Sequence, residues 1–197
     1  MNREMLLALA FGYLLGSIPF GLILTRLAGK GDVRDIGSGS IGATNVLRTG
    51  SKPLAAATLV LDCLKATAAI LIAQLVLGPE TGIAAAAGAL IGHLYPVWLK
   101  FRGGKGAATL LGILIALLWP AAIIYAVIWL ALLLTVRISS VASLTAAISA
   151  PLAALFLKEN TLFPMLLGFA LLVIWKHREN IMRLRKGAEP RIGRAKA

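Results

Sequence analysis

The sequence contains runs of apolar residues that are long enough to cross a membrane and carry no charge. Residues 5–24 form one such run, and residues 107–136 form a longer one. A membrane-spanning helix needs about 20 apolar residues, because each residue adds about 1.5 Å to its length. Hydrophobic residues make up 59% of the 197 residues and charged residues 14%, which excludes an ordinary soluble globule and a disordered chain. We therefore predict an all-α integral membrane protein.

Seven segments are the candidates for membrane spans. Trp119-Pro120 is expected to break the run 107–136, which as one straight helix would be about 45 Å long. The first run follows an N-terminus without a basic region or a small-residue cleavage site, so we interpret it as a retained span and not as a signal peptide. The predicted spans are residues 5–24, 53–77, 81–99, 107–118, 119–136, 138–157 and 161–175. We expect one domain over residues 1–197, with a basic cytoplasmic tail at about 176–197.

The basic residues indicate how the spans are oriented. With the N-terminus outside and the C-terminus in the cytoplasm, all of the 20 Lys and Arg residues except Arg3, Lys65 and Lys158 fall on the inside. Such an excess is typical of cytoplasmic loops, so the net charge of +12 is not by itself evidence for a nucleic-acid partner. A six-span alternative, with 107–136 as a single crossing, would place Arg137 and the serines after it outside.

Polar residues collect first in the loop between the first two spans, GKGDVRDIGSGSIGATNVLRTGSK. Its glycines happen to spell GxGxxG, but no strand precedes them, and Asp62, where a dinucleotide fold would have its acid, lies inside a span. Glycines expose backbone N–H groups to an anion. The alternative is a flexible cytoplasmic linker. The side-chain donors of this loop are Ser38, Ser40, Thr44, Asn45 and Arg48.

A second polar segment, GHLYPVWLKFRGGKGAAT, joins the third and fourth spans. It places three glycines around Lys105, directly before the helix predicted from residue 107. A cation beside the N-terminus of a helix favours an anion. The segment also contains His93, about two turns inside the span. This histidine is either a buried structural residue or a ligand.

The third and fourth polar segments lie at the ends of later spans. Two serines that open the sixth span, Ser139 and Ser140, are typical helix caps, whereas Ser143, one turn further in, is the better candidate for a substrate hydrogen bond. After the last span, His177 and Asn180 share one helix face. On another face, the spacing of residues 179 and 183 predicts an intrahelical pair between an acid and a base.

Two ionisable residues, Asp62 and Lys65, stand inside the second span. Intramembrane ionisable residues are functional candidates by default, but at this spacing the two can neutralise each other. We favour a structural pair that also borders the site. The sequence has no HEXXH motif, no carboxylate cluster and no Cys/His set, and Cys63 is its single cysteine, so we predict neither a metal site nor a disulfide.

The segments SGSIGATNVLRTGS, GHLYPVWLKFRGGKGAAT, SSVAS and HRENIMRLRKGAE resemble the cytoplasmic motifs of the bacterial acyl-phosphate:glycerol-3-phosphate acyltransferases. The resemblance covers nearly the whole chain, in order. One departure is Ser40-Ile41, where the family commonly has Asn-Pro. The HxxxxD pair of acyl-CoA-dependent enzymes is missing, since the fifth residue after each histidine is Trp98 or Met182.

The resemblance implies an enzyme of the bacterial inner membrane with its active site on the cytoplasmic face. It transfers a fatty acyl group from acyl phosphate to the sn-1 hydroxyl of glycerol 3-phosphate, and it gives lysophosphatidic acid and phosphate. We expect no cofactor, no metal and no nucleic acid; the substrates and membrane lipid are the expected partners, together with the soluble enzyme that makes acyl phosphate. His177 would act either as general base or only to orient the substrate.

Carried over to this sequence, the resemblance assigns residues to three sets. The catalytic set is His177, Lys105, Arg48, Asn180 and Ser143. The acyl phosphate set is Ser38, Asn45, Gly103, Gly104, Lys105 and Gly106. The glycerol 3-phosphate set is Arg48, Lys105, Ser143, His177 and Asn180. The alternatives from other classes are a transporter for a phosphorylated solute and a non-catalytic scaffold that binds anionic lipid through its basic tail. Few polar residues are predicted on the outer side, which favours the enzyme over the transporter.

Overall fold

The computed structural model describes residues 2–193, and all regular structure in this part of the chain is helical, which confirms the predicted fold class. The α-helices are α1 (Arg3–Gly16), α2 (Phe20–Leu27), α3 (Ala43–Leu47), α4 (Lys52–Leu77), α5 (Gly82–Leu94), α6 (Ala107–Leu117), α7 (Trp119–Thr135), α8 (Ser139–Phe156), α9 (Phe163–Lys176) and α10 (Arg178–Arg185). Three short 3-10 helices are η1 (Val33–Asp35), η2 (Pro79–Thr81) and η3 (Val97–Leu99). The last four residues of the predicted basic tail, 194–197, lie outside the described part.

Four helical stretches are long and apolar enough to cross a membrane, judged by length and composition: Arg3–Leu27, Lys52–Leu77, Pro79–Leu99 and Ser139–Phe156. Three shorter helices are also apolar: Ala107–Leu117, Trp119–Thr135 and Phe163–Lys176. Each of these helical stretches coincides with one of the segments predicted from the sequence. The number of crossings and their orientation stay predictions.

The predicted break near Trp119-Pro120 is confirmed. Helix α6 ends at Leu117 and α7 begins at Trp119, with Pro120 in the first turn of α7, where its missing N–H leaves no hydrogen bond unmade. The first run has a break that the sequence analysis did not expect, since α1 ends at Gly16 and α2 begins only at Phe20. Pro19, the residue before α2, cannot donate to the preceding turn, so this interruption has the same physical cause.

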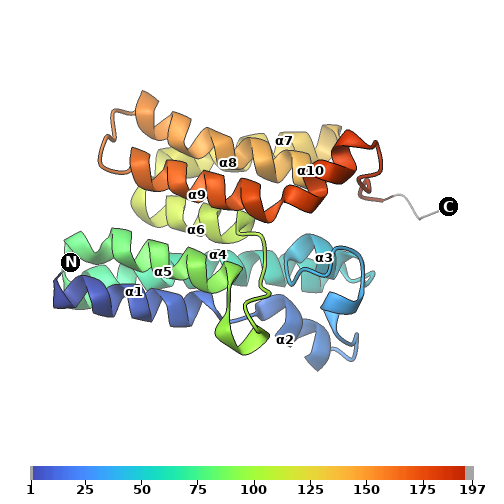
Figure 1. The fold of residues 1–197 in the computed structure, drawn as a ribbon, viewed down its shortest axis with the longest axis horizontal. Coiled ribbons are helices and arrows are strands. Elements are labelled where there is room, and N and C mark those ends of the chain that lie inside the picture. The colour runs from blue at the N-terminus through green and yellow to red at the C-terminus, as the bar shows by residue number, and fades with distance from the viewer. Residues whose placement is uncertain (1, 194–197) are drawn as a thin grey trace. The chain divides into compact units, whose positions relative to one another are not determined.

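The chain divides into two compact units, an N-terminal unit up to residue 117 and a C-terminal unit from residue 118, and each is described by itself. The sequence prediction of a single domain stays a prediction. In the N-terminal unit, α5 packs mainly along α1, and α4 packs against both α1 and α6 (Figure 1). In the C-terminal unit, α8 packs against α7 and α9.

Glycine allows the close approach of α1 and α5. A Cβ atom on Gly12 or Gly16 of α1 would lie 2.2 or 2.1 Å from a backbone oxygen of α5, and one on Gly88 of α5 would lie 2.1 Å from the Leu9 oxygen. No side chain fits at these distances. Small residues that let helix backbones touch are typical of packing inside membranes, where apolar burial from water no longer drives association.

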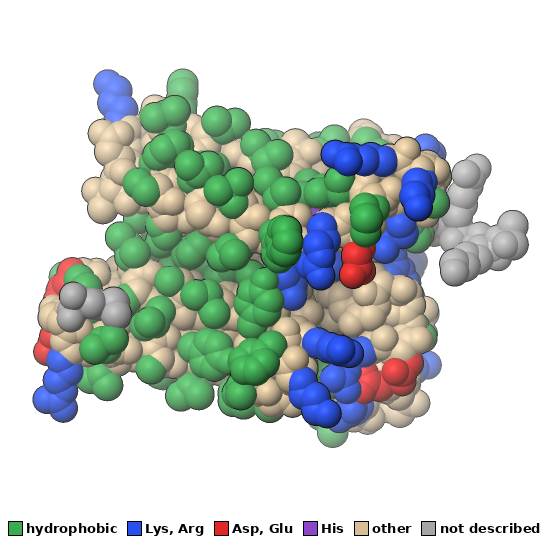
Figure 2. Space-filling model, in the orientation of Figure 1, with side chains coloured by type: hydrophobic (Ala, Val, Ile, Leu, Met, Phe, Trp, Pro, Cys, Tyr) green, Lys and Arg blue, Asp and Glu red, His purple; other side chains and the backbone are tan. Residues whose placement is uncertain are grey.

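Charged and hydrophobic side chains separate within each unit (Figure 2). In the N-terminal unit, Lys and Arg side chains gather over α2 and the loop after it, while α1 and α5 show hydrophobic side chains along their length. In the C-terminal unit, Lys and Arg side chains gather near α10. The polar loops that carry the predicted site residues therefore follow or precede the apolar helices, as the sequence analysis expected.

Candidate functional site

The glycine-rich loop before α4 is held together by the side chain of Asn45. Its amide nitrogen lies 2.7 Å from the carbonyl oxygen of Val33, 3.1 Å from that of Ile36 and 2.8 Å from that of Ser40. Its amide oxygen accepts a hydrogen bond from the backbone N–H of Ser38 at 3.1 Å. Asn45 is 2% exposed. The loop is thus an ordered structure, and the interpretation as a flexible linker was wrong.

Asn45 also fixes the orientation of Arg48. The Arg48 Nη1 atom donates to the Asn45 amide oxygen at 2.9 Å, while the Arg48 residue as a whole is exposed. Gly37 has a φ of +56°, and a Cβ there would collide with both Asn45 and Arg48. The loop therefore presents a guanidinium in a defined direction, and Gly37 is the residue that leaves room for it.

A cluster of buried apolar side chains packs against the same loop. The buried side chains of this cluster are Leu22, Val33, Ile41, Val46 and Ala55. Ile41 occupies the position where the resembled family commonly has proline, and it is 1% exposed. Its carbonyl oxygen would lie 2.0 Å from a Cβ on Gly21, so the loop backbone packs directly on α2. In this chain the isoleucine side chain fills the apolar cluster at the position where the family commonly has the more rigid proline.

The loop of residues 103–106 is tied to the end of α5. The backbone N–H groups of Gly103 and Gly104 donate to the carbonyl oxygens of Leu94 and His93, at 3.2 and 2.9 Å. A Cβ on Gly104 would lie 2.0 Å from His93 Nε2. These two amides therefore complete the last turn of α5, and glycine is required for packing. Both amides thus already donate within the protein, and the acyl phosphate role of residues 103 and 104 stays a prediction.

A buried ammonium group lies next to this loop, in the interior of the N-terminal unit. Lys65 Nζ donates to Asp62 Oδ1 at 2.7 Å and to the carbonyl oxygen of Ile18 at 2.8 Å, and it lies 3.0 Å from His93 Nδ1. The side chains of Asp62 and Lys65 are each 2% exposed. The predicted neutralising pair is confirmed, and the unexpected break between α1 and α2 supplies the third acceptor.

The Lys65 ammonium determines the tautomer of His93. An ammonium group has only donors, so Nδ1 of His93 must accept, and the ring proton lies on Nε2, the atom that faces Gly104. Of the two roles left open for His93, the contacts support the structural one. Asp62 and Lys65 in α4 thus connect through His93 to the loop that carries Lys105, which is itself half-buried.

In the C-terminal unit, a carboxylate takes the central position. Glu189 Oε1 accepts from Ser140 Oγ at 2.7 Å and from Asn180 Nδ2 at 2.5 Å, and Oε2 accepts from Arg183 Nε at 2.7 Å. The Glu189 side chain is 4% exposed. Sequence analysis did not single out Glu189. The signal that was present is a single acid among the many basic residues of 180–197.

The chain reverses direction after α10, and this brings Glu189 to its partners. Gly187 has a φ of +65°, and the N–H of Ala188 donates to the carbonyl oxygen of Arg183 at 2.8 Å, as at a glycine-terminated helix end. Burial raises the pKa of Glu189, but the hydrogen bonds from Asn180, Ser140 and Arg183 outweigh burial and hold it below its usual range. Glu189 is thus an ionised acceptor at neutral pH.

Two expectations for this unit were wrong. Arg183 pairs with Glu189 and not with Glu179, which is exposed. The N-cap of α8 is Ile138, without a side-chain cap hydrogen bond, so Ser140 acts as a donor to Glu189 and not as a cap. In both cases a contact with Glu189, beyond the end of α10, displaced one within a helix.

His177 and Asn180 share a buried face at the junction of α9 and α10, as predicted, and are 3% and 5% exposed. His177 Nδ1 lies 2.8 Å from the carbonyl oxygen of Val173. A carbonyl oxygen only accepts, so Nδ1 carries a proton and the lone pair of the neutral ring is on Nε2. This is the tautomer that can accept a proton or a hydrogen bond at Nε2.

Ser143 lies in α8 and is 5% exposed. Its hydroxyl oxygen accepts a hydrogen bond from the Trp129 indole N–H at 3.2 Å. An indole N–H can only donate, so this contact fixes the oxygen and does not use the hydroxyl proton. Ser143 therefore keeps the donor function for which the sequence analysis singled it out.

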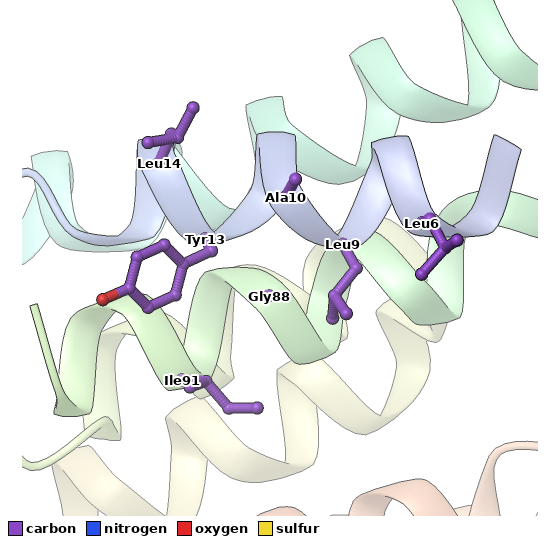
Figure 3. Close-up of a pocket in the computed structure, with 7 residues that line it drawn as sticks. All are labelled: Leu6, Leu9, Ala10, Tyr13, Leu14, Gly88 and Ile91. Atoms are coloured by element: carbon purple, nitrogen blue, oxygen red, sulfur yellow. The ribbon is translucent and has the colours of Figure 1, made fainter. Parts of the chain in front are cut away.

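An apolar groove of about 500 Å³ runs between α1 and α5 (Figure 3). Its lining residues are Leu6, Leu9, Ala10, Tyr13, Leu14, Gly88 and Ile91. The Tyr13 hydroxyl is already engaged, since it donates to the Tyr95 carbonyl oxygen and accepts from the Val97 N–H. The groove therefore offers contact with hydrocarbon and no group that would bind a phosphate.

The family model described as glycerol-3-phosphate acyltransferase matches residues 6–187. The chain belongs to this family. A glycerol-3-phosphate acyltransferase of Mesorhizobium japonicum is 59% identical over 98% of this chain and 98% of its own. One of Rhodopseudomonas palustris is 56% identical over 96% of both chains.

Solved structures agree with this membership. The crystal structure of PlsY, an integral membrane glycerol 3-phosphate acyltransferase, in its glycerol 3-phosphate form has a TM-score of 0.90 at 39% identity, over 96% of both chains. Its lysophosphatidic acid form has a TM-score of 0.87 at 38% identity, over 96% of this chain and 95% of that chain. The present chain is thus a glycerol-3-phosphate acyltransferase with the fold of an integral membrane enzyme, as the resemblance implied.

The structure brings the predicted site residues together in two groups, one in each unit. In the N-terminal unit, Ser38 and Arg48 are joined through Asn45, and the 103–106 loop is joined to His93. In the C-terminal unit, Asn180 is joined to Ser140 through Glu189. In this acyltransferase, Asn45 and Glu189 organise the side chains around them.

Proposed function

We propose that this acyltransferase takes its acyl group from acyl phosphate and transfers it to the sn-1 hydroxyl of glycerol 3-phosphate. The observation that carries the proposal is the guanidinium of Arg48, an exposed residue, which Asn45 holds in a fixed direction within an ordered loop. A fixed guanidinium is a receptor for phosphate oxygens. Acyl phosphate is a mixed anhydride with a good leaving group, so positioned cations matter more for the reaction than a covalent nucleophile.

The residues that touch the substrates are fewer than the sequence analysis assigned. Arg48, Lys105, Ser143, His177 and Asn180 are proposed to bind glycerol 3-phosphate. Lys105 is also proposed to bind acyl phosphate, with Ser38 and Gly106. The remaining three predicted ligands, Asn45, Gly103 and Gly104, have their polar groups bonded within the protein and are proposed to shape the binding loops.

The reaction forms one bond and breaks one. The hydroxyl oxygen of glycerol 3-phosphate attacks the acyl carbon, and the bond from that carbon to the phosphate oxygen breaks, so phosphate leaves with the electron pair. The hydroxyl proton passes to His177 Nε2 or to a phosphate oxygen of the substrates. Arg48 and Lys105 reduce the repulsion between the two anions. Since the leaving group needs little help, we favour the orienting role for His177, with Nε2 accepting a hydrogen bond from the hydroxyl.

We further propose seven spans in the bacterial inner membrane, with the N-terminus outside and the polar loops in the cytoplasm. The agreement between the apolar helices and the predicted segments supports this topology, as does the distribution of Lys and Arg. Cysteines introduced at Lys52 and Lys158, in a Cys63→Ala background, test it. A membrane-impermeant thiol reagent added to whole cells should label the cysteine at 158 and not the one at 52, and the opposite pattern would reverse the topology.

Release of phosphate by the purified protein tests the reaction. Protein in detergent micelles should release phosphate when it receives acyl phosphate and glycerol 3-phosphate together, and it should form no product from acyl-CoA. Lys105→Ala should lower both substrate binding and turnover, whereas Lys52→Ala, which removes an exposed cation outside the proposed site, should not. Product formation from acyl-CoA at a comparable rate would refute the choice of donor. The protein partner expected from the resemblance, the soluble enzyme that makes acyl phosphate, stays a prediction.

Variants of His177 separate the two possible proton acceptors. If His177 only orients the hydroxyl, His177→Gln should recover part of the activity that His177→Ala loses. If His177 is the obligatory base, both variants should lose roughly 10²-fold in turnover, and the wild-type rate should rise with pH along a limb that both lack. A wild-type limb combined with an inactive amide variant would exclude the orienting role.

A further inference from the structure

A second group of cations in the N-terminal unit lines a cavity that includes neither Arg48 nor Lys105. The cavity has a volume of about 420 Å³. Four of its lining residues are basic, and the other two are a tryptophan and a leucine. The lining residues are Arg26, Arg34, Lys100, Arg102, Trp98 and Leu99.

The four basic residues of the cavity carry more positive charge than the two carboxylates near them, Asp32 and Asp35, can neutralise. Asp32 binds Arg34 through both carboxylate oxygens, at 2.9 and 2.6 Å, and it binds Arg26 at 2.7 Å. The hydrogen bonds of Arg34, stronger than the opposing effect of burial, hold the pKa of Asp32 well below its usual range, so this carboxylate is ionised. Lys100 and Arg102 form no ion pair and no side-chain hydrogen bond within the part of the chain that the structure describes. Cations gathered in a cavity without matching acids favour an anionic ligand.

The segment that carries these two cations is held in an unusual conformation. Lys100 and Phe101 are consecutive non-glycine residues with φ of +52° and +62°. Such backbone is costly for side-chain-bearing residues and persists only where surrounding contacts impose it. The Phe101 N–H bonds the Pro96 carbonyl oxygen at 3.0 Å, and the Trp98 indole N–H bonds the Ser17 carbonyl oxygen at 2.8 Å. The strained turn is thus anchored to the end of α1.

The segment that supplies Trp98, Lys100 and Arg102 to the cavity also carries exposed apolar side chains. Val97, Trp98 and Phe101 are 49%, 50% and 58% exposed. Exposed aromatic side chains that alternate with Lys and Arg are typical of the membrane interface, where the rings lie at the level of the lipid headgroups. A site for a soluble anion would gain nothing from exposed rings beside its cations. The exposed rings next to Lys100 and Arg102 therefore indicate a ligand that belongs to the membrane.

We propose that this cavity binds the headgroup phosphate of an anionic phospholipid. Lys100 and Arg102 are its direct ligands, Arg26 and Arg34 add positive charge from the other wall, and Trp98 and Phe101 contact the lipid around it. The proposal does not depend on the acyl donor or on the roles proposed for Arg48 and Lys105. The proposal gives the strained turn a function. The positive φ angles of Lys100 and Phe101 place the cations of Lys100 and Arg102 beside the exposed rings of Trp98 and Phe101.

Lipid binding by protein in nanodiscs tests the proposal. The protein is reconstituted in phosphatidylcholine alone or with added phosphatidylglycerol, and bound lipid is counted by native mass spectrometry after release. The double variant Lys100→Gln/Arg102→Gln should bind phosphatidylglycerol about tenfold more weakly than the wild type, because it loses two charge-assisted contacts. The matched control Lys30→Gln/Lys52→Gln removes the same charge from residues outside the cavity lining and should bind as the wild type does. Equal loss in both double variants would overturn the proposal.

A second variant guards against misfolding as the cause of weaker binding. Glycine adopts a φ of +52° without strain, so Lys100→Gly removes one cation and relaxes the backbone. This variant should be at least as stable as the wild type and still bind phosphatidylglycerol more weakly, and unchanged binding would refute Lys100 as a ligand. Inorganic phosphate in phosphatidylcholine nanodiscs distinguishes the source of the phosphate. Inorganic phosphate that is as protective as phosphatidylglycerol at the same concentration would raise the melting temperature of the wild type but not of Lys100→Gly. That result would show that the cavity is a site for soluble anions and would overturn the lipid assignment.

Discussion

Each unit of the molecule is organised around one buried ionic group, and the two groups have opposite charge. In the N-terminal unit, the Lys65 ammonium lies within 2.7 to 3.0 Å of three acceptors, from Asp62, Ile18 and His93. In the C-terminal unit, the Glu189 carboxylate accepts from three donors at 2.5 to 2.7 Å. The Lys65 centre lies among apolar helices and includes an acid one turn away on the same helix. The Glu189 centre connects the first turn of α8 to α10 and depends on a chain reversal.

The difference in partners implies a difference in function. Lys65 bonds two groups that end or interrupt helices, the Ile18 carbonyl oxygen between α1 and α2 and the ring of His93 near the end of α5. Its loss should therefore affect the fold first. Glu189 bonds Asn180, which is itself a proposed substrate ligand. Its loss should affect turnover as well as stability.

The largest effect is expected for Lys65→Met. This change leaves the Asp62 carboxylate buried without its cation, and removal of one partner from a buried pair costs about 3–5 kcal/mol. We expect little folded protein, or a large decrease in melting temperature in detergent. The double variant Asp62→Asn/Lys65→Met removes both charges and should recover much of the loss. Lys52→Met, at the exposed start of the same helix, is the control. A single variant as stable as the wild type would show that the Lys65 centre does not hold the unit together.

A smaller effect is expected for Glu189→Gln. The amide keeps the shape of the side chain, but its NH2 group faces donors and the charge that Arg183 requires is lost. The unmet hydrogen bonds should cost about 1–3 kcal/mol, and turnover should fall because Asn180 loses its anchor. Glu179→Gln removes an exposed acid from α10 and should change neither quantity. If Glu179→Gln has the larger effect on melting temperature, the assignment of Arg183 to Glu189 fails.

The Glu189 centre should also respond to acid. Since folding lowers the pKa of Glu189, its contribution to stability is fully present above the ordinary carboxylate range, near about 4.3, and is lost as the pH falls through the lower folded value. Melting temperatures measured from neutral pH downward should show the wild type and Glu189→Gln converging below about pH 4. A difference that stays constant over this range would mean that the carboxylate charge is not what stabilises the unit.

The same comparison shows what could be predicted from the sequence. The helices, the break at Trp119-Pro120 and the Asp62–Lys65 pair follow from hydropathy, proline chemistry and helical spacing, and all of these are local. Glu189 could not be predicted because its partners come from α8 and α10 and meet it only after the turn at Gly187. Local patterns there favoured a pair with Glu179, and the longer-range contact displaced it.

The candidate site shows the same division between local and distant contacts. The sequence correctly indicated which residues are hydrogen-bond donors and cations. Whether each of them binds substrate or another part of the protein depends on which of its polar groups already have hydrogen-bond partners in the fold. The Asn45 side chain bonds three carbonyl oxygens and two donors, and the Gly104 N–H bonds the His93 carbonyl oxygen near the end of α5. A sequence gives no count of satisfied hydrogen bonds, since most of these partners are backbone groups.

The smallest effect is expected for Ser140→Ala, which removes one of the donors to Glu189. A hydrogen bond to a charged group contributes about 1.5–3 kcal/mol, but two other donors remain on the carboxylate, so we expect a loss near the lower end. The informative measurement is a double-mutant cycle with Glu189→Gln. If Ser140 acts through the carboxylate charge, Ser140→Ala should cost less in the Glu189→Gln background than in the wild type, by about 0.5 kcal/mol or more. Trp129→Phe removes a donor to Ser143 in the same unit, without contact to Glu189, and should add to Glu189→Gln without coupling. If the effects of Ser140→Ala and Glu189→Gln on stability simply add, Ser140 does not stabilise the carboxylate. The Glu189 centre would then rest on its contacts with Asn180 and Arg183 alone, and it would no longer match the three acceptors around Lys65.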